Sequence, residues 1–141
     1  MVNSNTAAVW APRVLSILRI MAALLLLQHG TQKLLGFPAF PAGRSAPAMM
    51  SMSWLAGVIE LVCGFLMAIG LFTRPAAFLA SGMTAVAYWM VHAGQNFYPI
   101  LNGGELAALY CFVFLYIAVA GPGPWSVDAK LRQDGKLPAW A

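Results

Sequence analysis

Apolar residues fill four stretches of this 141-residue chain, at about 13–35, 54–72, 75–92 and 103–120. Each stretch approaches the ~20 residues that a helix needs to cross ~30 Å of hydrocarbon. Proline and glycine interrupt the pattern at 36–47, 72–75 and 121–125, and these residue types end helices. The pattern predicts an all-α membrane protein built as a four-transmembrane-helix bundle. Residues 1–141 would form one integral membrane domain, with 121–141 as a short interfacial tail.

The composition excludes a soluble domain. Hydrophobic residues make up 61% of the chain and charged residues 9%, whereas about a quarter of a soluble domain is charged. The net charge of +4 comes from scattered basic residues that form no stripe or aromatic-interleaved patch, so nucleic acid is not expected as a partner. The expected partner of the surface is the lipid bilayer.

The basic residues also predict an orientation. Four crossings place the termini and the second loop on one side of the membrane. That side carries six basic residues: Arg13, Arg19, Arg74, Lys130, Arg132 and Lys136. The other side carries Lys33 and Arg44. Both termini are therefore expected in the cytoplasm by the positive-inside rule. Arg19 lies inside the first stretch and is expected to extend its side chain to the interface.

In this topology all four predicted helices bring an ionisable group to the outer third of the bilayer. These groups are His29, Glu60, His92 and Glu105. Charged groups in a membrane usually face the bundle interior or one another, so we expect a polar pocket. We assign candidate catalytic roles to His29, Glu60 and His92. Candidate binding roles go to six residues on the same helical faces or at the same depth: Gln28, Gln32, Lys33, Tyr88, Asn102 and Glu105.

Several of these residues also have structural interpretations. Gln32 and Lys33 can extend to lipid headgroups, and His92 can be an interfacial histidine. The segment "NGGE" (102–105) resembles a variant capping box, in which Asn102 and Glu105 would serve a helix start. Glu60 is the hardest to explain structurally, because a carboxylate in the middle of a membrane helix needs a partner.

Metal binding and cysteine pairing have weaker support. Glu-x-x-His pairs, which mark di-iron bundles, are absent from the sequence, and no metal ligand is assigned. Cys63 and Cys111 fall near the midpoints of their stretches, so they lie at similar depth. The sequence leaves open whether they pair, and buried thiols are the default for such cysteines.

Five segments together resemble the DoxX family: "HGTQKLLGFP" (29–38), "WLAGVIEL" (54–61), "GLFTRPAAFLASG" (70–82), "NGGELAALYCFVFLY" (102–116) and "GPGPWSVD" (121–128). The resemblance implies a small multi-pass protein of the bacterial inner membrane. It also implies a link to quinone-dependent respiration, thiosulfate oxidation or thiol-redox partners. Many relatives carry Glu where this chain has Met83, and "HHAP" where it reads "VHAG", so a proton relay through that acid is not expected here.

Two functions remain open at this stage. In the first, a quinone is the candidate cofactor of a redox-associated subunit. His29 or His92 would bind a carbonyl oxygen, Glu60 would move the proton, and Lys33 would stabilise the anionic form. Electrons would come from a redox partner protein, so the chain would not be a complete enzyme alone. In the second, the chain is a non-enzymatic scaffold or a lipid- or small-molecule-binding module, and the polar cluster is structural. A transporter is a weaker third option that would need a homo-oligomer.

Overall fold

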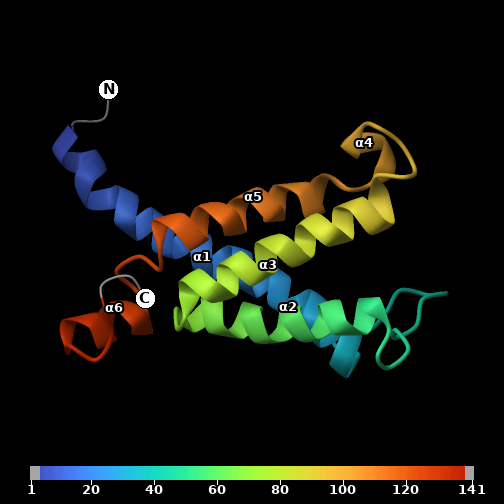
Figure 1. Cartoon of the computed structure of the whole chain (residues 1–141), viewed down its shortest axis with the longest axis horizontal. Coiled ribbons are helices and arrows are strands. Elements are labelled where there is room, and N and C mark those ends of the chain that lie inside the picture. The colour runs from blue at the N-terminus through green and yellow to red at the C-terminus, as the bar shows by residue number, and fades with distance from the viewer. Residues whose placement is uncertain (1–3, 139–141) are drawn as a thin grey trace.

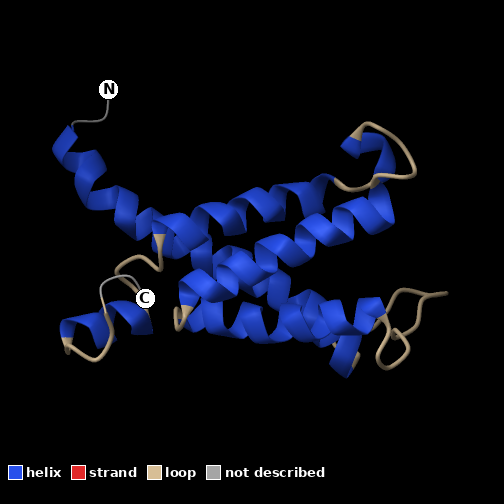
Figure 2. Ribbon diagram, in the orientation of Figure 1, coloured by secondary structure: helices blue, strands red, loops and turns tan. Residues whose placement is uncertain are grey.

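The computed structural model describes residues 4–138, which form helices and connecting loops without a strand (Figures 1 and 2). The helices are α1 (Ser4–Leu35), α2 (Met52–Ile69), α3 (Thr73–Ala87), α4 (Pro99–Asn102), α5 (Glu105–Ala120) and α6 (Val127–Gln133). A π-helical segment, η1 (Tyr88–His92), continues α3 without a break. The all-helical fold class is therefore confirmed for these residues.

The long helices pack as two pairs. α1 lies along α2, α3 lies along α5, and a smaller contact between α2 and α3 joins the pairs. Figure 1 shows the pairs close together near α6 and spread apart towards α4 and the loop between α1 and α2. This divergence determines where the polar residues of the four stretches finally lie.

The helix boundaries differ from the apolar stretches in explicable ways. α1 begins at Ser4 and not near residue 13, because its first turns are helical but exposed, and hydropathy detects only the apolar part. α2 ends at Ile69 because Gly70 adopts the left-handed conformation, with φ of 72°, and its N–H bonds to the carbonyls of the last turn. α5 begins at Glu105 because Gly103, with φ of 68°, ends α4 just before it.

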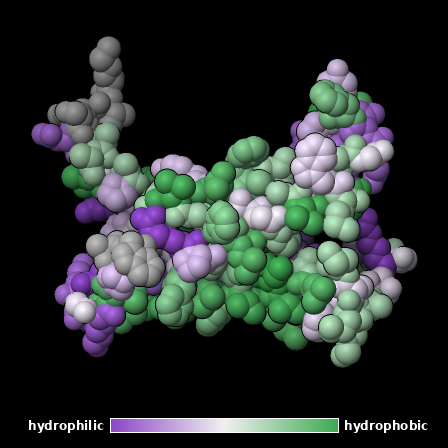
Figure 3. Space-filling view, in the orientation of Figure 1, coloured by the Kyte–Doolittle hydropathy of each residue, from purple (hydrophilic) through white to green (hydrophobic). Residues whose placement is uncertain are grey.

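The exterior of the helices is apolar. Two helical segments within residues 4–138 are long and apolar enough to cross a membrane, Asn5–Leu35 and Met52–Ile69, and Glu105–Ala120 is a shorter apolar helix. Phe78, Phe112 and Val119 are 68%, 69% and 73% exposed. Figure 3 shows a hydrophobic band across the middle of the face in view, with hydrophilic residues gathered at both ends. Such a continuous apolar surface is rare on soluble monomers and typical of contact with lipid.

Candidate functional site

Glycines bring α1 and α2 into close contact. A Cβ added to Gly30 of α1 would lie 2.5 Å from the backbone nitrogen of Leu61. A Cβ added to Gly64 of α2 would lie 3.0 Å from the Cα of Leu27. The first distance leaves no room for a side chain and the second is tighter than an ordinary contact, so the two helices approach closely where these residues lack a side chain. Small residues serve this purpose between helices in membranes.

An ion pair crosses this close interface. Lys33 of α1 donates from Nζ to Oε1 of Glu60 on α2 at 2.7 Å. Glu60 is 7% exposed, and its Oε2 has no hydrogen-bond partner among residues 4–138. His29 lies near enough to interact electrostatically with Glu60. Burying a carboxylate without a counter-charge costs free energy. Lys33, on the facing side of the α1–α2 interface, supplies that counter-charge for Glu60.

A second polar cluster lies where η1 and α4 meet. His92 Nδ1 is 2.9 Å from the carbonyl oxygen of Asn102, and the rings of His92 and Tyr88 stack with centroids 6.4 Å apart. Asn102 is buried, donating from Nδ2 to the carbonyl of Asn96 at 2.9 Å and to Oη of Tyr88 at 3.4 Å. These bonds fix the chain between η1 and α5.

The remaining candidate binding residues belong to neither cluster. Gln28 is exposed, and Gln32 donates to the carbonyl of Ala39 at 3.4 Å. Glu105 is exposed at the start of α5. The predicted capping box is wrong, because Asn102 Oδ1 accepts from the N–H of Gly104, which is itself the N-cap of α5.

The structure therefore divides the nine candidate residues instead of gathering them in one pocket. His29, Lys33 and Glu60 lie together on the first helix pair. Tyr88, His92 and Asn102 lie together at the far end of the second pair. The cause is the pairing of the helices and their divergence, which the depth of each residue in a bilayer cannot reveal.

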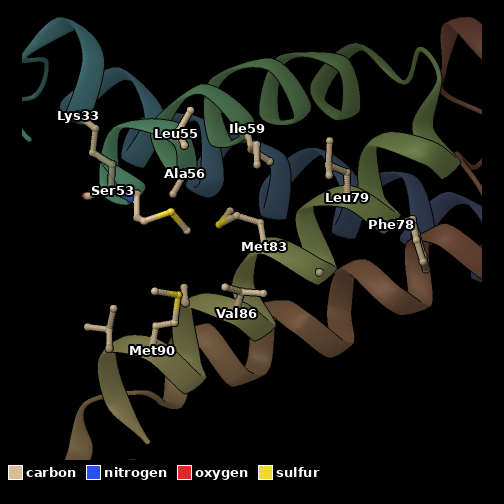
Figure 4. Close-up of a pocket in the computed structure, with 14 residues that line it drawn as sticks. Lys33, Ser53, Leu55, Ala56, Ile59, Phe78, Leu79, Met83, Val86 and Met90 are labelled. Atoms are coloured by element: carbon tan, nitrogen blue, oxygen red, sulfur yellow. The ribbon is translucent and has the colours of Figure 1, made fainter. Parts of the chain in front are cut away.

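An apolar groove of about 550 Å³ opens between α2 and the α3–η1 segment. Figure 4 shows Leu55, Ala56 and Ile59 on one side of this groove and Met83, Val86 and Met90 on the other. Lys33 and Ser53 are the polar residues in the lining. Lys33, whose ammonium bonds to Glu60, is thus a lining residue of the groove. Glu60 itself is not a lining residue and contacts the groove only through Lys33.

The position of Arg19 differs from the one expected from the sequence: its side chain is fully buried and does not extend to the interface. Its Nε donates to the carbonyl of Pro122 at 2.7 Å, and its Nη2 to that of Trp125 at 2.5 Å. Its Nη1 donates to the carbonyls of Met67 and Ala68 at the end of α2. Unpaired carbonyls at a helix end and in a Pro/Gly loop are acceptors that hydropathy cannot detect.

Asp128 was also missed. It is 1% exposed, and its two carboxylate oxygens accept from the N–H groups of Phe72 and Thr73, both at 2.9 Å. A carboxylate is favourable there because α3 begins at Thr73. The segment expected to be a free interfacial tail therefore contains a helix, α6, that is docked against the bundle. The available signal was an acid two residues after the N-cap Ser126, in the first turn of α6.

The other chemically distinctive groups do not form a centre. Residues 4–138 bring no three His, Cys, Asp or Glu side chains together as a metal site. Cys63 and Cys111 are free thiols, and Cys111 Sγ lies 3.7 Å from Oγ of Ser81.

These features define a small helical membrane protein that has a buried ion pair between its first two helices. The chain belongs to the DoxX family, whose model, described as DoxX, matches residues 14–93. The resemblance seen in the sequence is thereby confirmed.

Three relatives illustrate the breadth of the family. An uncharacterized protein of Haemophilus influenzae is 43% identical over 129 residues, which cover 89% of this chain and 96% of that protein. The inner membrane protein YphA of Escherichia coli is 30% identical over 131 residues, 84% of this chain and 91% of YphA. The uncharacterized membrane protein Rv3486 of Mycobacterium tuberculosis is 29% identical over 136 residues, 86% of this chain and 83% of Rv3486. No solved structure matches the chain.

Proposed function

We propose that the protein crosses the bacterial inner membrane four times, through α1, α2, the α3–η1 segment and α5, with both termini in the cytoplasm. The α3–η1 segment supplies a continuous helix over residues 73–92, and α5 supplies 16 apolar-rich residues. The excess of basic residues on the side of the termini supports the orientation. The name of the E. coli relative, an inner membrane protein, supports the location.

Within that membrane, the protein is a quinone-binding, redox-associated subunit whose site is the groove. The observation that carries the proposal is that Lys33 is the charged residue in the lining of a mostly apolar groove, while its ammonium is held by Glu60. A quinone needs an apolar space for its ring and tail and a donor for a carbonyl oxygen. The volume of about 550 Å³ lies within the range of small-molecule sites.

A bound quinone would accept two electrons and two protons. The residues of this chain bind and orient it. Lys33 would donate one of the remaining N–H groups of its ammonium to a quinone carbonyl oxygen, while Glu60 holds that ammonium in place across 2.7 Å. Oε2 of Glu60, which no residue in 4–138 engages, is the group that holds or moves a proton beside the groove, with His29 nearby. Electrons come from a partner redox protein.

His92 takes a supporting role in this proposal. It does not line the groove, and its Nδ1 faces the carbonyl of Asn102. It orients the end of the α3–η1 segment, whose Met90 and Val91 line the groove.

A second candidate function is the lipid-binding module. Apart from Lys33 and Ser53, the twelve other lining residues of the groove are apolar. A lipid acyl chain could therefore pack against the same residues as a quinone. Under this alternative the ion pair is structural. The two candidates predict different molecules in the same place.

Extraction of the purified protein tests both candidates. The chain is isolated in mild detergent, and its quinone and phospholipid content per protein is measured by mass spectrometry. Gly82→Phe fills the groove, since a Cβ at Gly82, a lining residue, meets no atom within 4 Å. Gly94→Phe is the matched control, because Gly94 has equal space and lies outside the groove.

Near-stoichiometric quinone in the parent and in Gly94→Phe, with at least a tenfold loss in Gly82→Phe, supports the quinone proposal. If phospholipid and not quinone is retained in the parent and in Gly94→Phe and lost in Gly82→Phe, the groove binds lipid and the quinone proposal is wrong. Equal ligand content in Gly82→Phe and Gly94→Phe overturns the groove as a binding site.

A further inference from the structure

A second pocket, of about 420 Å³, lies at the end of the molecule that carries α6. Its lining comes from the first half of α1, the start of α3, the end of α5 with the chain that follows it, and α6. Two of its lining residues are arginines, Arg74 and Arg132, and none is acidic. Figure 3 shows hydrophilic residues gathered at this end of the face in view.

Arg74 is held in place by the end of α5. Its Nη1 donates to the carbonyls of Ala118 and Val119, at 2.9 and 2.5 Å. Gly121, with φ of +95°, makes this possible, because a Cβ there would lie 2.9 Å from Nη2 of Arg74. Within residues 4–138, Nη2 itself donates no hydrogen bond. The guanidinium is thus fixed along one edge and keeps a free donor.

Arg132 is held by a hydrogen bond within its own helix, α6. Its Nε donates to the carbonyl of Asp128 at 3.3 Å, and its two Nη atoms donate no hydrogen bond to the described part of the chain. The carboxylate of Asp128 is occupied by the N–H groups of Phe72 and Thr73. It therefore faces α3 and does not engage either guanidinium in the pocket.

Two cations that share a pocket without an acid repel each other unless an anion lies between them. We propose that this pocket binds a phosphate group, and that an anionic phospholipid headgroup at the cytoplasmic interface is its source. Guanidinium groups pair with phosphate through parallel hydrogen bonds. Pro12, Leu15 and Ala120 offer apolar contacts beside the arginines, which suit the glycerol and upper acyl region. Basic pockets between membrane helices bind lipid headgroups in this manner.

The lipid source rests on the proposed four-span topology, but the phosphate chemistry does not depend on the groove or on quinone binding. Gly82→Phe should therefore leave phosphate binding unchanged, and this result separates the two proposals.

Native mass spectrometry of the full chain in detergent tests the site. Phosphatidylglycerol, phosphatidylcholine and inorganic phosphate are added separately. Arg132→Gln should lower the retention of phosphatidylglycerol about tenfold, as expected for the loss of a charge-assisted hydrogen bond. Lys130→Gln is the matched control, because Lys130 is exposed on the same helix, outside the pocket, and loses the same charge. Arg132→Lys, which keeps the charge and loses the planar fork, should retain an intermediate amount.

Selective retention of phosphatidylglycerol over phosphatidylcholine, lost in Arg132→Gln and kept in Lys130→Gln, supports a lipid headgroup. Binding of inorganic phosphate with the same variant dependence, and no lipid retention, assigns the site to a soluble phosphate instead. Equal retention in parent and Arg132→Gln, or equal loss in Arg132→Gln and Lys130→Gln, overturns the site.

Discussion

Lys33 on α1 and Glu60 on α2 approach within 2.7 Å across an interface that glycines keep narrow. The pair is asymmetric in its surroundings. The Lys33 side chain is 24% exposed, whereas that of Glu60 is 9% exposed. An unpaired Lys33 can extend towards the interface, but an unpaired Glu60 stays among apolar atoms. Because of this difference, substitution of Lys33 and substitution of Glu60 should change the free energy of unfolding by different amounts.

Lys33→Met should destabilise the protein more than Glu60→Gln. Removal of the lysine leaves a buried charge without a partner, which costs about 3 kcal/mol. Glu60→Gln leaves a lysine that can reach water, and the loss of one interhelical polar contact costs about 1 kcal/mol. The double variant should cost less than the sum of the two. Unfolding by sodium dodecyl sulfate in mixed micelles measures these free energies. Equal costs that simply add would contradict the coupling.

Gly30→Val should destabilise the contact between α1 and α2. The new side chain meets the backbone of Leu61, which cannot move without displacing α2, and overpacking of this kind costs about 1–3 kcal/mol. Gly82→Ala is the control, because its Cβ meets open space, and it should leave stability unchanged or raise it slightly. The same unfolding assay applies. A neutral Gly30→Val would show that the helices can separate freely.

Arg19→Lys should fail to replace Arg19. A lysine ammonium cannot reach the carbonyls of Pro122, Trp125 and α2 together, since these require the planar fork of a guanidinium. We expect a loss of about 3 kcal/mol and faster proteolysis after residue 120. Arg13→Lys, an exposed position on the same helix, should behave as the parent. Limited proteolysis followed by mass spectrometry measures the release of the segment. Unchanged cleavage in Arg19→Lys would refute the anchoring role.

Cysteine labelling tests the proposed topology. In a Cys63→Ser, Cys111→Ser background, Arg44→Cys should react with a membrane-impermeant maleimide on intact spheroplasts, because the loop between α1 and α2 faces outward. Lys136→Cys should react only after the membrane is opened. The proposed topology has three crossings between these two positions. Labelling of both positions from the same side would therefore contradict it.

The sequence contained enough information to identify the helices but not their partners. Hydropathy located each long helix, and helical spacing placed Lys33 and Glu60 on faces that do meet. It could not assign His92 to a different helix pair from Glu60, because the depth of a residue says nothing about lateral neighbours. Arg19 was misread for a related reason. Its acceptors are backbone carbonyls about fifty and one hundred residues further along the chain, and carbonyls have no sequence signature.

The π-helical turn η1 shows a similar limit. Its residues, Tyr88 to His92, read as ordinary apolar helix, and their sequence does not predict the wider turn. The His92–Asn102 and Asn102–Asn96 hydrogen bonds connect η1, the following loop and α4. Such non-local constraints on a short segment are set by tertiary structure and not by local propensity.

The position of Asp128 has a consequence for biogenesis. Chains are made from the N-terminus, so α1 with Arg19, and α3 with its open first turn, leave the ribosome before Pro122, Trp125 and Asp128 exist. Arg19 and the N–H groups of Phe72 and Thr73 therefore gain these partners only when this later part of the chain has been made. Nascent chains that stop before α6 thus lack the carboxylate that accepts from the first N–H groups of α3.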